Sequence, residues 1–185
     1  MGVPANFTEL FIRLDYMNLK IVVLDVDGTM TDGGIYIDNK RVETKKFSIK
    51  DGAGILLAQQ MGIEFMILTG RRSHCVKQRA NELKVKYVIQ EVHNKKAYLE
   101  QFMERNIISK NELAYVGDDL NDLPAMKLVG YCACPFDAAP EVKNYCDIVL
   151  SKKGGDGAVR EFIEILLKNR NQWENAIEKL YAMKL

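Results

Sequence analysis

Two aspartates, Asp25 and Asp27, come directly after an apolar run at residues 21–24 and stand before a glycine. A carboxylate can attack phosphorus to form an aspartyl-phosphate, which divides one difficult displacement into two easier ones. A second carboxylate nearby can act first as general acid and then as general base. Asp25 is the better nucleophile because it ends the predicted strand, while Asp27 on the following turn can reach a leaving oxygen. The pair therefore predicts phosphoryl transfer.

A second acidic group, Asp118, Asp119 and Asp122, follows another apolar run. A single strand-end aspartate is often only a helix N-cap, but capping does not account for acidic groups after two separate strands. Carboxylates that converge on one site repel one another and cost stability unless a cation lies among them. Because oxygen ligands suit a hard cation, we expect the site to bind Mg²⁺.

Other polar groups also follow predicted strands, namely Thr69 with Gly70, Arg71, and Lys95. A hydroxyl, backbone amides and a lysine can hold the equatorial oxygens of a phosphoryl group in line for attack. The milder interpretations are a capping hydroxyl for Thr69 and a solvated amine for Lys95. We favour phosphate binding by Thr69, Gly70 and Lys95, because in an open parallel sheet ligands bind beyond the carboxyl ends of the strands.

The elements that must position these groups alternate along the chain. Short runs rich in β-branched and aromatic residues alternate with segments of helical period, which is typical of βαβ units and predicts an α/β fold with a mostly parallel sheet. We expect strands at residues 20–25, 64–69, 86–90, 113–117, 130–133 and 147–150. We expect helices or helical turns at residues 54–61, 73–83, 95–106, 120–128, 141–144, 158–168 and 171–185.

A chain of 185 residues with 48% apolar content can bury one core, so a single domain over residues 1–185 is expected. Residues 1–18 form an N-terminal extension in this interpretation. Residues 33–48 alternate like a β-hairpin, with a turn at residues 38–40, and are predicted to form a flap. Residues 152–185 read as a glycine-rich turn followed by a C-terminal helical tail.

The composition limits the function classes. Lys plus Arg (26) nearly balances Asp plus Glu (25), which gives no support for nucleic acid or membrane as a partner. Four cysteines without a CxxC pair and only two histidines argue against a zinc site. No segment resembles a signal peptide, so the cytoplasm is the expected location. No apolar stretch approaches the roughly 20 residues that span a bilayer.

Taken together, the motifs resemble the haloacid dehalogenase superfamily of phosphotransferases. The matching segments are Asp25-Val-Asp27-Gly28-Thr29, Thr69-Gly70, Lys95, and Gly117-Asp118-Asp119-Leu-Asn-Asp122, in the order of the four family motifs. The resemblance implies a Rossmann-like three-layer α/β/α sandwich, with Asp25 as nucleophile and Asp27 as acid and base. It also implies that Asp25 and Asp118 bind Mg²⁺ through side chains and Asp27 through its backbone carbonyl, with Asp119 and Asp122 as supporting or water-mediated ligands.

Further segments are similar to the 3-deoxy-D-manno-octulosonate 8-phosphate (KDO 8-phosphate) phosphatases: residues 32–33, 50–55, 69–71, 79–80 and 154–161. That subfamily lacks a cap domain and forms tetramers in which a neighbour's hairpin and tail help to close the site, so we expect a homotetramer. The resemblance makes Arg71 and Arg79 candidates for binding the carboxylate of the sugar acid, because a planar guanidinium pairs with a carboxylate through two hydrogen bonds. The implied reaction releases inorganic phosphate from KDO 8-phosphate in lipopolysaccharide sugar biosynthesis.

Three alternatives remain open. Relatives that act on 2-keto-3-deoxy-nononate (KDN) 9-phosphate tend to carry an acid after Thr-Gly, where this chain has Arg71. A receiver domain also gathers acids, a threonine and a lysine at a sheet edge, but its phosphoacceptor ends the third strand, and here that strand ends in Tyr87-Val-Ile-Gln90. The third alternative is a phosphatase-like fold retained as an interaction module, which the full set of chemical groups disfavours.

Overall fold

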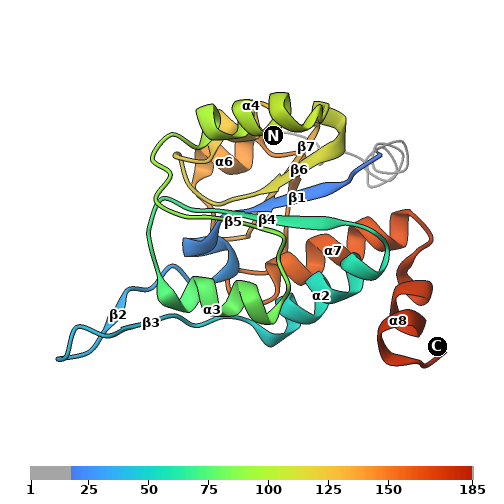
Figure 1. Cartoon of the computed structure of the whole chain (residues 1–185), viewed down its shortest axis with the longest axis horizontal. Coiled ribbons are helices and arrows are strands. Elements are labelled where there is room, and N and C mark those ends of the chain that lie inside the picture. The colour runs from blue at the N-terminus through green and yellow to red at the C-terminus, as the bar shows by residue number, and fades with distance from the viewer. Residues whose placement is uncertain (1–17, 185) are drawn as a thin grey trace.

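The computed structural model describes residues 18–184. Its centre is a six-stranded sheet in the order β5-β4-β1-β6-β7-β8, in which every neighbouring pair is parallel (Figure 1). The strands are β1 (Ile21–Leu24), β4 (Glu64–Leu68), β5 (Tyr87–Ile89), β6 (Leu113–Val116), β7 (Tyr131–Cys134) and β8 (Ile148–Val149). The chain runs from β1 outward to β4 on one side and later to β6 on the other. The strand order therefore reverses beside β1, where sheets of this type bind ligands.

Helices cover both faces of the sheet (Figure 1). One face carries α2 (Ile49–Gln60), α3 (His74–Glu82), α7 (Ala158–Asn169) and α8 (Trp173–Tyr181). The other carries α4 (Lys95–Asn106), α5 (Leu123–Met126) and α6 (Pro140–Tyr145). The single turn η1 (Val26–Met30) follows β1, and the single turn η2 (Lys110–Glu112) precedes β6. The prediction of a three-layer α/β/α sandwich around a parallel sheet is confirmed.

Strand β1 is buried on both faces, which explains its unbroken apolar sequence. Val22 and Leu24 pack into the core under α2 and α7, while Ile21 and Val23 pack into the core under α4. Alternate side chains of a strand point to opposite faces, so both layers of helices are held by the same four residues. The strand that leads into the acidic turn is thus fixed from both sides.

Helix α2 begins at Ile49, whereas the sequence analysis placed its start at residue 54. Ser48 caps the helix by accepting a hydrogen bond from a backbone N–H of the first turn. Gly52 and Gly54 lie inside the helix because neighbouring helices press against it. A Cβ added to Gly52 would lie 2.2 Å from Nη2 of Arg79, and one added to Gly54 would lie 3.0 Å from α7. These glycines lie at the contacts of α2 with its neighbouring helices, and the predicted start at residue 54 is wrong.

The segment predicted as a flap contains two short antiparallel strands, β2 (Tyr36–Ile37) and β3 (Glu43–Thr44). This hairpin projects away from the layers of the sandwich (Figure 1). Its turn is organised by Asp38, whose carboxylate accepts hydrogen bonds from the backbone N–H groups of Lys40 and Val42, both at 2.8 Å. The hairpin has no other layer beneath its tip, so its apolar side chains stay exposed.

The C-terminal helix α8 ends at Tyr181, short of the predicted end at residue 185. Ala182 adopts a left-handed conformation with φ of 53°, which stops the helix. Apart from residue 18, the predicted N-terminal extension (residues 1–18) lies outside the described residues. Within residues 18–184, we find no helix long and apolar enough to cross a bilayer.

Candidate active site

Three carboxylates meet at the carboxyl edge of the sheet: Asp25 after β1, and Asp118 and Asp122 after β6. Within this group, one oxygen of each carboxylate lies within 4.8 Å of those of the other two. The meeting follows from the register of the sheet, in which Leu24 pairs with Val116 on the adjacent parallel strand. We call these three residues together with Lys95 the acidic cluster.

Lys95, the first residue of α4, lies between two of the carboxylates. Its Nζ donates to Oδ1 of Asp25 at 2.5 Å and to Oδ1 of Asp122 at 2.6 Å, and its side chain is only 2% exposed. Burial alone lowers the pKa of Lys95, but the charges of Asp25 and Asp122 outweigh that effect and the net pKa is raised. The amine therefore stays charged and offsets part of the negative charge.

Asp122 is held on both oxygens by the protein itself. Its Oδ1 accepts from the hydroxyl of Tyr115 at 2.7 Å in addition to Lys95. Its Oδ2 accepts from the backbone N–H groups of Asp118 at 3.1 Å and Asp119 at 3.4 Å. These contacts make Asp122 the residue that orders the turn after β6, which fits a supporting position better than that of a direct metal ligand.

The charge of the acidic cluster is poorly balanced. Burial raises the pKa of Asp25 to about 7 and the charge of Asp122 adds to the rise, while Lys95 opposes it. Burial raises the pKa of Asp118 to about 8, and the charges of Asp25 and Asp122 contribute. One ammonium group thus faces three carboxylates. A cation would supply the missing compensation, and a donor set made only of oxygen fits Mg²⁺.

The turn after β1 contacts Asp118, which follows β6. Gly28 has φ of +94°, and a Cβ added there would lie 2.0 Å from Oδ2 of Asp118, so only glycine permits this approach. The hydroxyl of Thr29 donates to Oδ1 of Asp118 at 3.0 Å. The Asp-Gly-Thr part of the motif therefore positions Asp118 as well as the turn itself.

The glycine-rich turn before α7 packs on this same turn of its own chain. The backbone N–H of Gly155 donates to the carbonyl of Thr29 at 3.1 Å. A Cβ added to Gly154 would lie 1.8 Å from the carbonyl oxygen of Gly28. The two backbones are in direct contact, so the tail motif supports the site within one chain.

A second group of charges lies beside the acidic cluster and is formed with the base of the hairpin. Lys45 pairs with Asp27 and lies 3.5 Å from Glu43, although its side chain is only 2% exposed. Arg71 contacts Glu43 at 3.1 Å and approaches Asp27 to 3.9 Å. We call Asp27, Glu43, Lys45 and Arg71 the hairpin network. Lys45 and Glu43 were not predicted as site residues. In an alternating hairpin, the sequence does not show whether Lys45 or its neighbour Lys46 points inward.

Thr69 and Gly70 lie where the sequence predicted, directly after β4. The backbone of Thr69 donates to the carbonyl of Ile89 at 3.0 Å and accepts from Val92 at 3.1 Å, which ties it to the neighbouring strand end. Among the described residues, its hydroxyl accepts one hydrogen bond, a long one of 3.5 Å from the N–H of Arg71. The hydroxyl of this buried side chain is thus weakly engaged because its one hydrogen bond is long.

Arg79 is the predicted site residue that the single chain does not bring to the others. Its Nη1 pairs with Glu82 at 3.1 Å, and its Nη2 donates to the carbonyl of Ser48 at 3.3 Å. These contacts join α3 to the start of α2. None of the contacts described for Arg79 reaches the acidic cluster, so its role in binding a sugar carboxylate stays a prediction.

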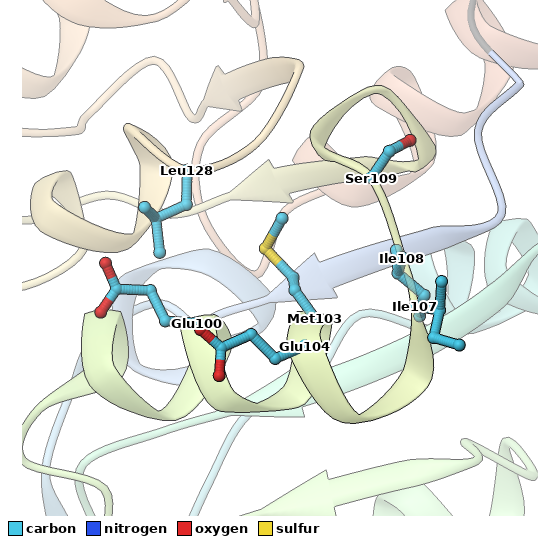
Figure 2. Close-up of a pocket in the computed structure, with 7 residues that line it drawn as sticks. All are labelled: Glu100, Met103, Glu104, Ile107, Ile108, Ser109 and Leu128. Carbon is cyan, nitrogen blue, oxygen red and sulfur yellow. The ribbon is translucent and has the colours of Figure 1, made fainter.

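A cavity of about 570 Å³ lies beside α4 (Figure 2). It is lined by Glu100, Met103, Glu104, Ile107, Ile108, Ser109 and Leu128. Its two charged side chains are glutamates, which repel an anionic phosphate ester. None of the predicted site residues lines it, so we do not associate it with phosphate chemistry.

Comparisons with known proteins also indicate a hydrolase of the haloacid dehalogenase type. Residues 88–163 match the haloacid dehalogenase-like hydrolase family. The 3-deoxy-D-manno-octulosonate 8-phosphate phosphatase KdsC of Escherichia coli (strain K12) is 38% identical over 159 residues, which is 86% of this chain and 85% of that protein.

Solved structures of such phosphatases have the same fold. The phosphatase from Moraxella catarrhalis, crystallised in complex with magnesium ion, phosphate ion and KDO, has a TM-score of 0.88 and 33% identity, covering 94% of this chain and 99% of that one. The phosphatase from Yersinia pestis has a TM-score of 0.85 and 34% identity, covering 90% of this chain and 89% of that one.

Proposed function

The chain belongs to the haloacid dehalogenase-like hydrolase family, and from this membership we propose that it hydrolyses 3-deoxy-D-manno-octulosonate 8-phosphate to KDO and inorganic phosphate. The observation that carries the reaction type is the meeting of Asp25, Asp118 and Asp122, two of which, Asp25 and Asp122, pair with the buried Lys95. The substrate follows from the KdsC relative, which matches most of both chains. The reaction belongs to the biosynthesis of the lipopolysaccharide sugar.

The first step transfers the phosphoryl group to the protein. A carboxylate oxygen of Asp25 attacks phosphorus, and the bond between phosphorus and the sugar oxygen breaks. Asp27 donates its proton to that departing oxygen. Lys95 orients the attacking carboxylate through its contact with Oδ1 and opposes the rise in the pKa of Asp25. The products of this step are the free sugar acid and a phosphorylated Asp25.

The second step returns the enzyme to its starting state. Water attacks phosphorus, and Asp27, now a carboxylate, accepts a proton from that water. The bond between phosphorus and Asp25 breaks, which regenerates the carboxylate and releases inorganic phosphate. Thr69, the backbone N–H of Gly70 and Lys95 bind the phosphate oxygens during both steps, and the weakly engaged hydroxyl of Thr69 is free to do so.

Mg²⁺ is the cofactor in this proposal. Asp25 and Asp118 hold it through their side chains and Asp27 through its backbone carbonyl, with Asp122 as the supporting residue. When bound, the ion offsets the negative charge of the carboxylates and of the phosphate ester. The structure of the Moraxella catarrhalis relative contains magnesium ion, which supports Mg²⁺ as the cofactor.

We also propose that the protein is a homotetramer in the cytoplasm. The hairpin exposes a group of apolar side chains, Ile35, Tyr36, Ile37 and Val42, and such a group is typical of a protein interface. All four cysteines are free thiols, which suits a reducing compartment. Sedimentation that gives an active monomer would contradict the assembly.

A substrate profile tests the function. Phosphate release is measured for a panel of sugar phosphates with Mg²⁺, and KDO 8-phosphate is expected to give the highest kcat/KM. If KDN 9-phosphate leads by about tenfold, which is 1.4 kcal/mol of transition-state binding, the substrate is wrong although the reaction class stands. Sustained turnover separates a phosphatase from a receiver-like domain, which would retain the phosphoryl group on Asp25.

A further inference from the structure

Asp51 is a buried carboxylate that takes no part in the proposed reaction. It lies in the first turn of α2 and is only 3% exposed. Its Oδ1 accepts a hydrogen bond of 2.8 Å from the backbone N–H of Arg160, in the first turn of α7. Its Oδ2 has no hydrogen-bond partner among the described residues. A buried charge therefore joins the start of one helix to the start of another.

The helix that Asp51 holds continues directly from the glycine-rich turn. Gly157, the residue before α7, has φ of +102°, so the chain changes direction there. Gly155 in the same turn donates to the carbonyl of Thr29, and the hydroxyl of Thr29 donates to Asp118. A continuous set of contacts thus leads from Asp51 to a carboxylate of the acidic cluster.

We propose that Asp51 is a positioning residue: its carboxylate anchors the start of α7 and thereby holds the glycine-rich turn against Gly28 and Thr29, which fixes Asp118. This assignment rests on the proposed phosphatase function. The stabilisation of a carboxylate by a helix N-terminus supplies its physical basis, because the first N–H groups of a helix lack partners within the helix.

The charges around Asp51 make the anchor sensitive to pH. Burial raises the pKa of Asp51 to about 6, and Asp156 in the glycine-rich turn adds to the rise, while the N–H groups of Arg160 and Gly157 oppose it. The guanidinium of Arg160 points to Glu164, at 2.7 Å, and stacks on Trp173.

No side-chain cation therefore contacts the carboxylate among the described residues. On α3, Arg79 reaches the start of α2 and donates to the carbonyl of Ser48 rather than to Asp51. A protonated Asp51 is a weaker acceptor, so its hold on α7 weakens as the pH falls through about 6.

The test compares wild type with Asp51→Asn, which keeps the shape and one acceptor oxygen but removes the charge. At pH 7.5 we expect kcat for KDO 8-phosphate to fall about tenfold with KM changed by less than about twofold, because the reacting groups are displaced slightly. The ratio of wild-type to variant kcat should approach one by pH 5, where wild-type Asp51 is itself protonated. A ratio that is constant from pH 5 to 8, or equal to one throughout, overturns the proposal.

A readout without catalysis separates this proposal from the function. In hydrogen exchange at pH 7.5, Asp51→Asn should raise the exchange of amides in residues 152–160 and 25–31 while other segments stay unchanged. Unchanged exchange in residues 152–160 overturns the proposal even if the enzyme hydrolyses a different ester. Asp156→Asn, which removes an exposed carboxylate from the same turn, is the matched control. At pH 7.5, where Asp51 is charged in both proteins, its kcat should stay within about twofold of that of wild type. If Asp51→Asn folds poorly, Asp51→Ser replaces it with the same expected ratio.

Discussion

The acidic cluster and the hairpin network lie side by side at one edge of the sheet, yet their charges are arranged in opposite ways. In the acidic cluster one buried ammonium faces three carboxylates, so the protein alone leaves negative charge uncompensated. In the hairpin network Lys45 and Arg71 face Asp27 and Glu43, so the charges balance without a metal. The first arrangement suits a cation and the reacting phosphoryl group.

Within the acidic cluster, the largest effect on activity is expected from loss of the nucleophile, Asp25. Asp25→Asn should lower kcat by about 10⁴-fold or more, because the carboxylate that accepts the phosphoryl group in the proposed reaction is replaced by a far weaker nucleophile. Phosphate release under saturating substrate and Mg²⁺ measures the effect. Glu100→Gln, the same chemical change on α4 beside the separate cavity, is the control and should keep wild-type turnover. Activity in Asp25→Asn close to that of wild type would remove Asp25 from its role.

The comparison predicts a different result in the hairpin network. Asp27→Asn should lower kcat by about 10²- to 10⁴-fold, the usual contribution of a general acid and base. Its affinity for Mg²⁺ should stay close to that of wild type, since only the backbone carbonyl of Asp27 is assigned to the metal. Titration calorimetry with Mg²⁺ measures this. A loss of metal affinity equal to that of Asp118→Asn would show that the two regions are not separate.

A smaller effect is expected at the outer part of the hairpin network. Arg71→Ala should raise KM for KDO 8-phosphate by about tenfold with little change in kcat, because a guanidinium that binds the sugar carboxylate contributes to binding in both ground and transition states. Arg72→Ala is the matched control, since that side chain is exposed and pairs only with Glu91 among the described residues. An equal fall in kcat for Arg71→Ala would place Arg71 in the chemical step.

The last prediction concerns stability rather than activity and sharpens the contrast in charge. In protein freed of metal by a chelator, burial raises the folded-state pKa of Asp25 to about 7 and that of Asp118 to about 8, above the ordinary value of 3.8. Between these limits the folded state binds more protons than the unfolded state, so their contribution makes the free energy of unfolding fall as the pH rises from about 4 to about 8.

Denaturant unfolding of the metal-free protein, in the presence of a chelator, at pH 5 and pH 8 measures this fall. Asp118→Asn should reduce it, because one of the two titrating groups is gone, and excess Mg²⁺ should reduce it in wild type by compensating the charge. A fall of the same size in Asp118→Asn and in wild type would mean that the acidic cluster is not its source.

Much of the acidic cluster was predictable because strand ends obey a simple rule. Asp25 ends a predicted strand and Asp118 and Lys95 follow others, and adjacent parallel strands deliver the residues at their carboxyl ends to one edge. Arg79 follows no strand, and its expected role came from resemblance alone. The single chain places Arg79 between α3 and α2, and nothing in its local sequence indicates this.

The start of α2 shows why local patterns failed elsewhere. Gly52 and Gly54 lower helix propensity, yet both lie within α2, and at Gly54 the absence of a Cβ lets Arg160 of α7 pack close to the helix. Propensity reports the preference of an isolated segment, whereas tertiary packing decides which segments lie in contact. Asp51 lies in the segment 50–55 that carries the resemblance, but its role as an anchor for α7 depends on a residue more than a hundred positions away.

The amino-acid sequence by itself determined the alternation of strands and helices, the convergence of acids at one sheet edge and the type of reaction, because each depends on short-range periodicity and on the direction of parallel strands. Only the tertiary structure decided that Lys45 turns inward to Asp27, that the tail glycines pack on the first turn, and that Asp51 holds α7. These contacts join segments distant in the chain, and their energy comes from burial and charge that exist only once those segments have met.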